Sequence, residues 1–174
     1  MGRVSTAYLL TCAAIGVAGG VLFWGAGWIA TAVFAVAPFV SVAGAGLWLL
    51  PSTIALRLLE RPFAGILTGV LAGLVAFPFL AAAVWWGFMA ELAFLVVLYR
   101  FWRTWQYWAG AVVVGIVYPV AAAQSFDLWA MTPVAVVGFF ALTLASCLAG
   151  VGLGVLVADR LRAAGVARLA RRRR

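Results

Sequence analysis

Long apolar runs dominate this sequence, and nearly all of its charge falls between them or after the last one. Of the 174 residues, 68% are hydrophobic and only 9% are charged. A soluble domain usually has about 25% charged residues. A soluble fold of this length buries only about 70% of the surface of its unfolded chain, so it could not hide this much apolar surface. The sequence therefore predicts an all-α integral membrane protein.

Six of the runs are long enough to cross a bilayer, which takes about 20 residues in a helix. We expect a compact six-helix transmembrane domain over residues 1–160 and a basic cytoplasmic tail over 161–174. Because only Arg3 precedes the first run, we expect a retained helix there and not a cleaved signal peptide. The predicted helices cover residues 4–24, 38–56, 62–80, 84–101, 106–124 and 131–158.

The arginines predict the orientation of the bundle. All 12 basic residues are arginines, and with six spans all of them fall on one side. By the positive-inside rule both termini are then cytoplasmic, whereas an odd number of helices would scatter the arginines over both faces. The run 171–174 is expected to anchor the chain at the lipid surface, and we expect no nucleic-acid partner.

Several residue types on which catalytic, metal and phosphate-binding sites depend are missing. The sequence contains no His, Lys or Asn. It therefore has no Ser–His–Asp triad, no usual zinc or haem site and no Walker A phosphate loop. We expect no enzyme activity, no cofactor and no metal site, and any ATP-driven work needs a partner. Cys12 and Cys147 lie in apolar runs and are expected to be buried free thiols.

Among the 4 acidic residues, Glu91 is the one expected inside the membrane. With a helix starting near Trp85, it would lie about 9 Å below the outer mouth. A carboxylate there costs at least about 2.5 kcal/mol to insert unless it is paired or hydrated. Two interpretations are open, a ligand or ion contact in a wet cavity and a protonated structural Glu bonded to another helix. Glu60 and Asp159 are expected to pair with arginines beside them.

The outer half of the predicted bundle is rich in aromatic side chains. Aromatic faces attract cations and stack on flat heterocycles, although Trp and Tyr are also enriched in interfacial belts. Gly87 lies one helical turn before Glu91 on the same face and would leave room beside the carboxylate. The candidate substrate-binding residues are Glu91, Gly87, Trp85, Trp86, Tyr118, Gln124, Trp129 and Trp28.

Two further features concern the first helix and the segment after it. Residues 25–37 are apolar and uncharged, and they end before Pro38, which suits the first turn of a helix. We expect a loop or short helix there that could act as a lid; the alternative is a longer second helix kinked at Pro38. Ala14 and Ala18 form a small-residue pair that lets another helix approach, either a partner or a neighbour in the bundle.

Three stretches in the middle of the chain resemble a known family. Arg61–Gly65 opens the third predicted helix, Gly87–Phe94 holds a Gly-x-x-x-Glu-Leu-x-Phe pattern, and Tyr99–Trp102 is an aromatic and basic exit from the fourth. With six helices and no ATPase machinery, the chain resembles the substrate-binding (S) component of an energy-coupling factor (ECF) transporter. The similar group is the YkoE-like one, associated with thiamine or its hydroxymethylpyrimidine precursor.

The resemblance implies a multi-pass subunit of a bacterial cell membrane that captures a small aromatic cation, such as thiamine or hydroxymethylpyrimidine, from outside. It implies a transmembrane coupling subunit and two ATPase subunits as partners, with Ala14 and Ala18 on the docking face. Glu91 would hold the cationic part of the ligand, so Glu91→Gln is expected to weaken binding by about tenfold or more.

Other function classes stay open from the sequence. A non-transporting accessory membrane protein would use Glu91 as an interhelical polar contact. A channel or proton-coupled carrier usually needs several intramembrane acids, and this chain offers one. An integral membrane enzyme is the least expected, because no nucleophile and base pair is visible.

Overall fold

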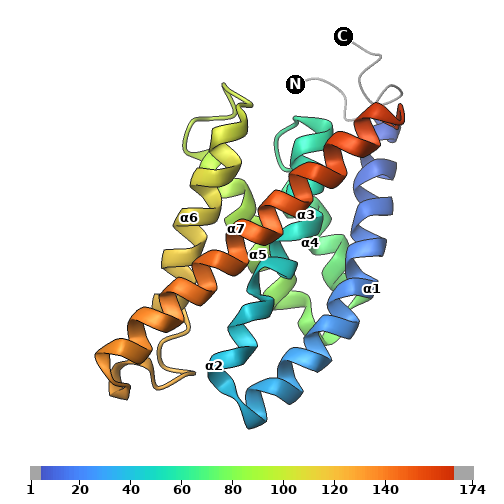
Figure 1. Cartoon of the computed structure of the whole chain (residues 1–174). Helices are drawn as coiled ribbons and strands as arrows, with labels where there is room; N and C mark the ends of the chain where they lie inside the picture. Colours follow the sequence, from blue (N-terminus) through green and yellow to red (C-terminus); the bar gives the residue numbers. More distant parts are fainter. Residues whose placement is uncertain (1–4, 167–174) are drawn as a thin grey trace.

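The computed structural model describes residues 5–166, and the regular structure within that range is entirely helical (Figure 1). Short 3₁₀ helices join some of the α-helices: η1 (Val42–Gly44), η2 (Phe77–Phe79) and η3 (Leu128–Ala130). The α-helices are α1 (Thr6–Val36), α2 (Pro38–Ser41), α3 (Ala45–Leu59), α4 (Ala64–Val75), α5 (Leu80–Leu95), α6 (Thr104–Ala121) and α7 (Pro133–Ala163).

The helices cross the bundle six times, as predicted, because α2, η1 and α3 together make one broken crossing over Pro38–Leu59. Four crossings within the described range are long and apolar enough to span a membrane by themselves. The other two are α4, an apolar helix of 12 residues, and α6, of 18 residues. The predicted all-α membrane fold is confirmed.

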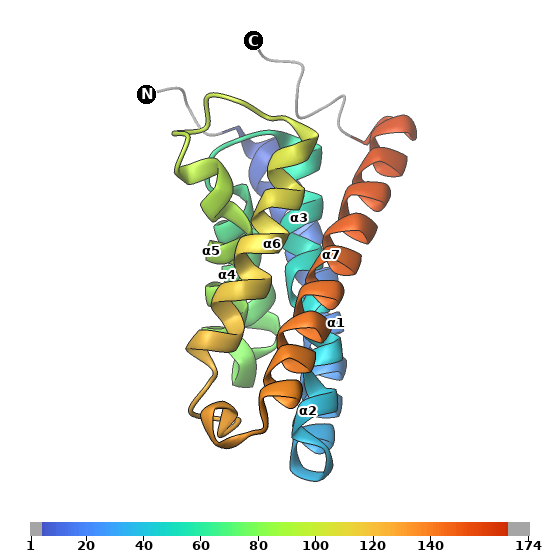
Figure 2. The ribbon, with the colours of Figure 1, turned by 60° about the vertical axis from the view of Figure 1, so that its left-hand side comes forward.

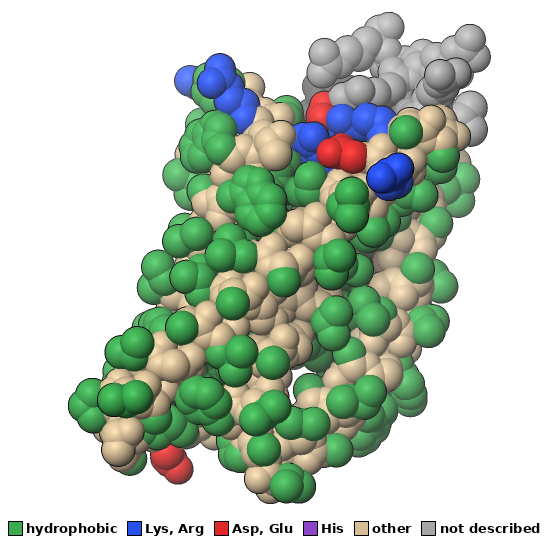
Figure 3. Space-filling model, in the orientation of Figure 1, with side chains coloured by type: hydrophobic (Ala, Val, Ile, Leu, Met, Phe, Trp, Pro, Cys, Tyr) green, Lys and Arg blue, Asp and Glu red, His purple; other side chains and the backbone are tan. Residues whose placement is uncertain are grey.

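Helix α1 begins and α7 ends at the same end of the bundle (Figures 1 and 2), and the arginines of the described range gather there (Figure 3). Figure 3 shows basic and acidic side chains at this end and an apolar surface along the sides of the helices. By the positive-inside rule this end is cytoplasmic. The last helix, α7, runs to Ala163, five residues beyond its predicted end at residue 158. Arg3, Arg168 and the run 171–174 lie outside the described residues.

Ion pairs join two helices at the cytoplasmic end. Arg57 at the end of α3 binds Asp159 of α7, with 3.0 Å between Nε and Oδ1. Arg162 of α7 binds Glu60, which follows α3, at 3.0 Å. Both acidic residues pair with arginine as expected, but these arginine partners come from the other helix.

The first helix differs most from its prediction. It continues to Val36, so the expected lid over residues 25–37 is wrong, as is the alternative of a longer second helix. The segment is apolar and contains no proline before Pro38, so nothing in it stops the helix. The helix ends because a residue before proline avoids the α conformation, and Ala37 lies outside the α region with φ −143° and ψ 74°. Pro38 does open the next helix, as expected.

The helix that contains Glu91 also shifts. It runs from Leu80 to Leu95, whereas the prediction was 84–101. Its predecessor α4 is shorter than expected and ends at Val75, close to Pro78 in η2. After α5, Leu98 and Tyr99 adopt positive φ angles of 51° and 57°, which end the helical course.

Glycines bring the helix backbones together in the middle of the bundle. A Cβ atom on Gly46 of α3 would overlap the Ser146 carbonyl of α7, and one on Gly150 would overlap the Gly46 carbonyl. The Ser146 hydroxyl also accepts a hydrogen bond from the Gly46 amide at 2.9 Å. Small residues allow such close crossings in lipid, where helix association depends on packing. The crossing holds α3 against α7 beside the outer cavity, which Ala45 and Trp48 of α3 line.

Candidate functional site

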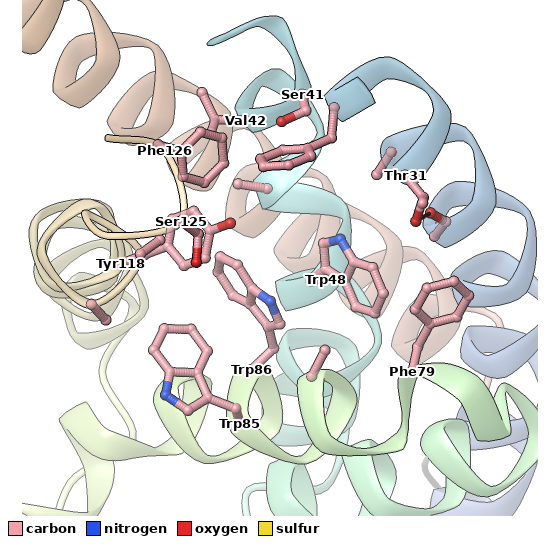
Figure 4. A pocket seen from close by; sticks show the side chains of 17 residues that line it. Thr31, Ser41, Val42, Trp48, Phe79, Trp85, Trp86, Tyr118, Ser125 and Phe126 are labelled. Carbon is pink, nitrogen blue, oxygen red and sulfur yellow. Dashed lines mark hydrogen bonds between the residues drawn. The ribbon is translucent and has the colours of Figure 1, made fainter. Parts of the chain in front are cut away.

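A cavity of about 540 Å³ lies in the outer half of the bundle, at the end opposite the arginines (Figure 4). It is bounded by the outer part of α1, by α2, by the first turns of α3 and α5, and by the last turns of α6 with the loop that follows. Its aromatic lining comes from Phe34, Trp48, Phe79, Trp85, Trp86, Tyr118 and Phe126.

The aromatic rings form two walls. On one side Trp86 packs on Tyr118, with 4.8 Å between ring centroids and 37° between planes, and Trp85 lies edge-on to Trp86 at 5.0 Å. On the other side Trp48 contacts Phe79 edge-on, with centroids 5.9 Å apart. Figure 4 shows these walls on either side of the cavity. Rings placed in this way can take a flat aromatic molecule between them.

The cavity is electrically neutral among the described residues. Its polar lining consists of hydroxyls and indole nitrogens, with no acidic or basic side chain. The Thr31 hydroxyl donates to the Gly27 carbonyl at 2.9 Å, and the Ser41 hydroxyl donates to the Pro38 carbonyl at 2.6 Å. Stacking and single hydrogen bonds are therefore the interactions that this lining offers.

The structure brings together three of the predicted substrate-binding residues, Trp85, Trp86 and Tyr118. Three others lie outside the cavity. Trp28 is 52% exposed on α1, Trp129 is 66% exposed on η3, and Gln124 is exposed in the loop before it. Sequence alone did not single out Trp48, Phe34, Phe79 or Phe126. For Trp48 a signal was present, since it follows the small-residue run 43–46 in its predicted helix.

Glu91 is fully buried but does not line the cavity. It lies about 16 Å along α5 from Leu80 and about 6 Å from Leu95, since each helical residue adds about 1.5 Å. The expected depth near the outer mouth is therefore wrong, because the helix begins four residues earlier than predicted and ends soon after Glu91.

Donors from two other segments surround the Glu91 carboxylate. Oε1 accepts hydrogen bonds from the Phe63 amide and from the Tyr99 hydroxyl, the latter at 2.9 Å. Oε2 accepts one from the Ile66 amide at 2.8 Å. Burial and the nearby Glu91 charge raise the pKa of Tyr99, so its hydroxyl remains a donor at neutral pH. Each carboxylate oxygen thus has a partner within the chain.

These contacts make Glu91 the N-terminal cap of α4. The helix starts at Ala64 after Phe63, whose φ of 64° and apolar side chain provide no cap. The first amides of a helix lack internal partners, and negative charge is favourable at that end. Gly87 brings α5 close to α4 instead of leaving room for a ligand, since a Cβ there would lie 2.9 Å from the Gly65 carbonyl oxygen. The position of Glu91 favours a structural role.

The small residues of α1 divide between two faces. Gly16 and Gly20 pack against α4, where a Cβ atom would meet Leu71 and Val75. Ala14 and Ala18 are exposed and line an apolar groove of about 630 Å³ between α1, α3 and α7. Their role in partner docking stays a prediction, and their side chains are accessible for it. Cys12 and Cys147 are buried free thiols, as predicted.

Comparisons with known proteins agree with this architecture. A solved structure described as the crystal structure of an S-component of an ECF transporter shares the fold, with a TM-score of 0.81 and 18% sequence identity. The alignment covers 95% of this chain and 89% of that one. No curated protein sequence matches the chain.

The sequence itself matches one protein family over residues 8–117, which is more than half of its length. That family is described as the permease component of an ABC-type cobalt transport system. The match agrees with the expectation of a transport component and not an enzyme. The chain therefore belongs to this family of membrane transport components.

Proposed function

We propose that this chain is the substrate-binding membrane subunit of an ECF-type importer, which captures a small planar aromatic compound from outside. The observation that carries the proposal is the neutral cavity of about 540 Å³ between walls of Trp and Tyr at the outer end of the bundle. Its volume lies within the range of small-molecule sites, about 300–1,000 Å³. Thiamine and its hydroxymethylpyrimidine precursor are the candidate substrates, since both contain a flat ring.

An organic substrate fits the cavity better than the metal ion in the family description. Cobalt and similar ions bind imidazole, thiolate or carboxylate ligands. No group of three or more such side chains occurs within residues 5–166 that could hold a metal. The two buried thiols also lie outside the lining.

The proposed binding mode differs from the one expected from sequence. Glu91 is engaged with α4 and Tyr99, so a cationic ring would be held by the faces of Trp48, Trp85 and Trp86. Cation–π contacts contribute about 0.5–2 kcal/mol each, depending on desolvation. The carboxylate is not needed in this mode.

The partners follow from what the chain lacks. Without lysine it cannot form a Walker A loop, so ATP hydrolysis requires separate ATPase subunits. We propose that a transmembrane coupling subunit docks at the groove beside Ala14 and Ala18. Ala14→Leu should abolish co-purification with that subunit and leave substrate binding unchanged. Ala141→Leu, at an exposed alanine on α7 outside the groove, is the matched control.

Tryptophan fluorescence tests the central claim. Titration of the purified protein with thiamine and with hydroxymethylpyrimidine should quench emission, because the rings would stack on pocket tryptophans. Native mass spectrometry of the purified protein should also detect a bound small aromatic molecule. Binding of Co²⁺ without binding of either organic compound would contradict the proposal. Failure of every ligand would favour the accessory membrane protein, for which Glu91 already provides the interhelical polar contact.

A further inference from the structure

The Trp86 indole has an N–H group that faces the cavity and has no partner in the described part of the chain. Its side chain is only 4% exposed and lines the cavity. Its nitrogen makes no hydrogen bond to any residue between 5 and 166, and Figure 4 shows it facing the space between the two walls. Buried Trp N–H groups usually find an acceptor, because an unpaired donor loses the hydrogen bond that water would give it. The missing acceptor is therefore expected to come from whatever fills the cavity.

A second donor lies on the opposite wall. Trp48 of α3 also lines the cavity, and its indole nitrogen likewise has no partner in the described part of the chain. Figure 4 shows the nitrogens of Trp48 and Trp86 directed toward the cavity from α3 and α5. The indole N–H can only donate, so both walls present donors and neither can accept through this group.

The lining also carries the hydroxyls of Thr31, Ser41, Ser125 and Tyr118, which can accept as well as donate. The hydroxyls of Thr31 and Ser41 donate to carbonyls of their own helices. Carboxylates and cationic side chains are absent from the described lining. A ligand with in-plane acceptors can pair with both indoles, whereas a plain hydrocarbon ring of the same shape leaves both N–H groups unpaired.

We propose that Trp86 and Trp48 determine specificity by donating hydrogen bonds to a planar ring that bears acceptors, such as ring nitrogens or carbonyl oxygens, on two edges. This inference rests on the proposed function and goes further, since it names the feature of the substrate that is recognised. A site built to hydrogen-bond its ligand strongly rejects an analogue without the partner atom, because its own buried groups then stay unpaired.

The proposal is tested with a series of ring compounds that carry the same substituents and differ only in the number of ring nitrogens. The probes are hydroxymethylpyrimidine and its analogues in which one or both ring nitrogens are replaced by C–H. The wild-type protein should lose about tenfold in affinity with each nitrogen removed, since a lost buried hydrogen bond costs about 1–2 kcal/mol. 3-Benzothienylalanine keeps the shape of indole without the N–H. With this residue in place of Trp86, removing one of the two ring nitrogens should no longer cost the tenfold loss of affinity.

The control and the outcomes separate this inference from the proposed function. The same replacement at Trp28, which is exposed and outside the cavity, should leave the whole series unchanged. If all probes bind the wild-type protein equally well, the donor role is overturned while binding of aromatic compounds stands. If the Trp86 replacement leaves the step sizes unchanged, its role is overturned too. If no probe binds at all, the proposed function itself fails.

Discussion

The two ends of α5 show two different ways of burying polar groups in a membrane helix. At the cytoplasmic end the Glu91 carboxylate is fully buried and accepts hydrogen bonds from two backbone amides and a tyrosine. At the outer end, Trp85 and Trp86 line a neutral cavity, and the indole N–H of Trp86, which faces that cavity, has no partner among the described residues. At the cytoplasmic end the buried polar group finds its hydrogen-bond partners within the chain. At the outer end the indole donor is left to pair with a molecule in the cavity.

The difference shows which buried polar group indicates a ligand. An intramembrane acid is a functional candidate by default because it is costly to insert. Here that cost is offset by the unpaired amides of α4, which a carboxylate satisfies. The better indicator is the donor that the fold leaves unsatisfied beside an open cavity.

The largest expected effect comes from removing the carboxylate. Glu91→Ala leaves the amides of Phe63 and Ile66 and the Tyr99 hydroxyl without acceptors. Each buried unsatisfied group costs about 1–3 kcal/mol, so with three such groups we expect a loss of at least about 3 kcal/mol in unfolding free energy. Thermal unfolding in detergent measures this loss.

The isosteric change provides the control. Glu91→Gln keeps one acceptor oxygen and should destabilise less, while the folded fraction binds ligand with nearly unchanged affinity. A Glu91→Gln variant with normal stability and tenfold weaker binding would restore the prediction made from sequence.

At the outer end of α5 we expect a substitution to reduce ligand affinity more than stability. Trp85→Ala removes a ring that packs on Trp86 and Tyr118 at the cavity wall. We expect ligand affinity to fall by about tenfold, because an aromatic contact contributes about 0.5–1.5 kcal/mol beyond its buried area. Trp129→Ala, at an exposed ring outside the cavity, should bind normally. Equal losses for both variants would place the binding site elsewhere.

A smaller effect is expected at Tyr99. Tyr99→Phe removes one of the donors to Glu91 and keeps both backbone amides. A hydrogen bond to a charged group contributes about 1.5–3 kcal/mol, so the loss of stability should be clearly below that of Glu91→Ala. Chemical denaturation of the two variants compares them directly. If Tyr99→Phe is as damaging as Glu91→Ala, the backbone amides contribute nothing.

The smallest effect is expected at the exposed ion pair. The side chains of Arg57 and Asp159 are 15% and 45% exposed. Exposed pairs are screened by water and salt, so Asp159→Asn should cost less than about 1 kcal/mol, and high salt should shrink the difference. A loss comparable to that of Glu91→Ala would mean that the Arg57–Asp159 pair is as well protected from solvent as the Glu91 carboxylate.

The sequence predicted the spans and orientation because hydropathy and arginine placement act over whole segments. It missed the course of residues 25–36, because an apolar helix and an apolar loop look alike without a breaker. It placed Trp85, Trp86 and Tyr118 in one site through their shared outer position. It misplaced Glu91, since an error of four residues in the start of α5 moves a side chain by about 6 Å. The capping of α4 by another helix depends on tertiary contacts that no local pattern contains.

The lengths of α1 and α7 have a consequence for the surrounding lipid. Each has 31 residues and is therefore about 46 Å long, whereas the hydrocarbon layer of a bilayer is about 30 Å thick. Such hydrophobic mismatch is relieved by leaning the helices or by stretching the acyl chains around them. Bilayer thickness thus affects the tilt of these helices, and lipids with longer acyl chains should reduce that tilt.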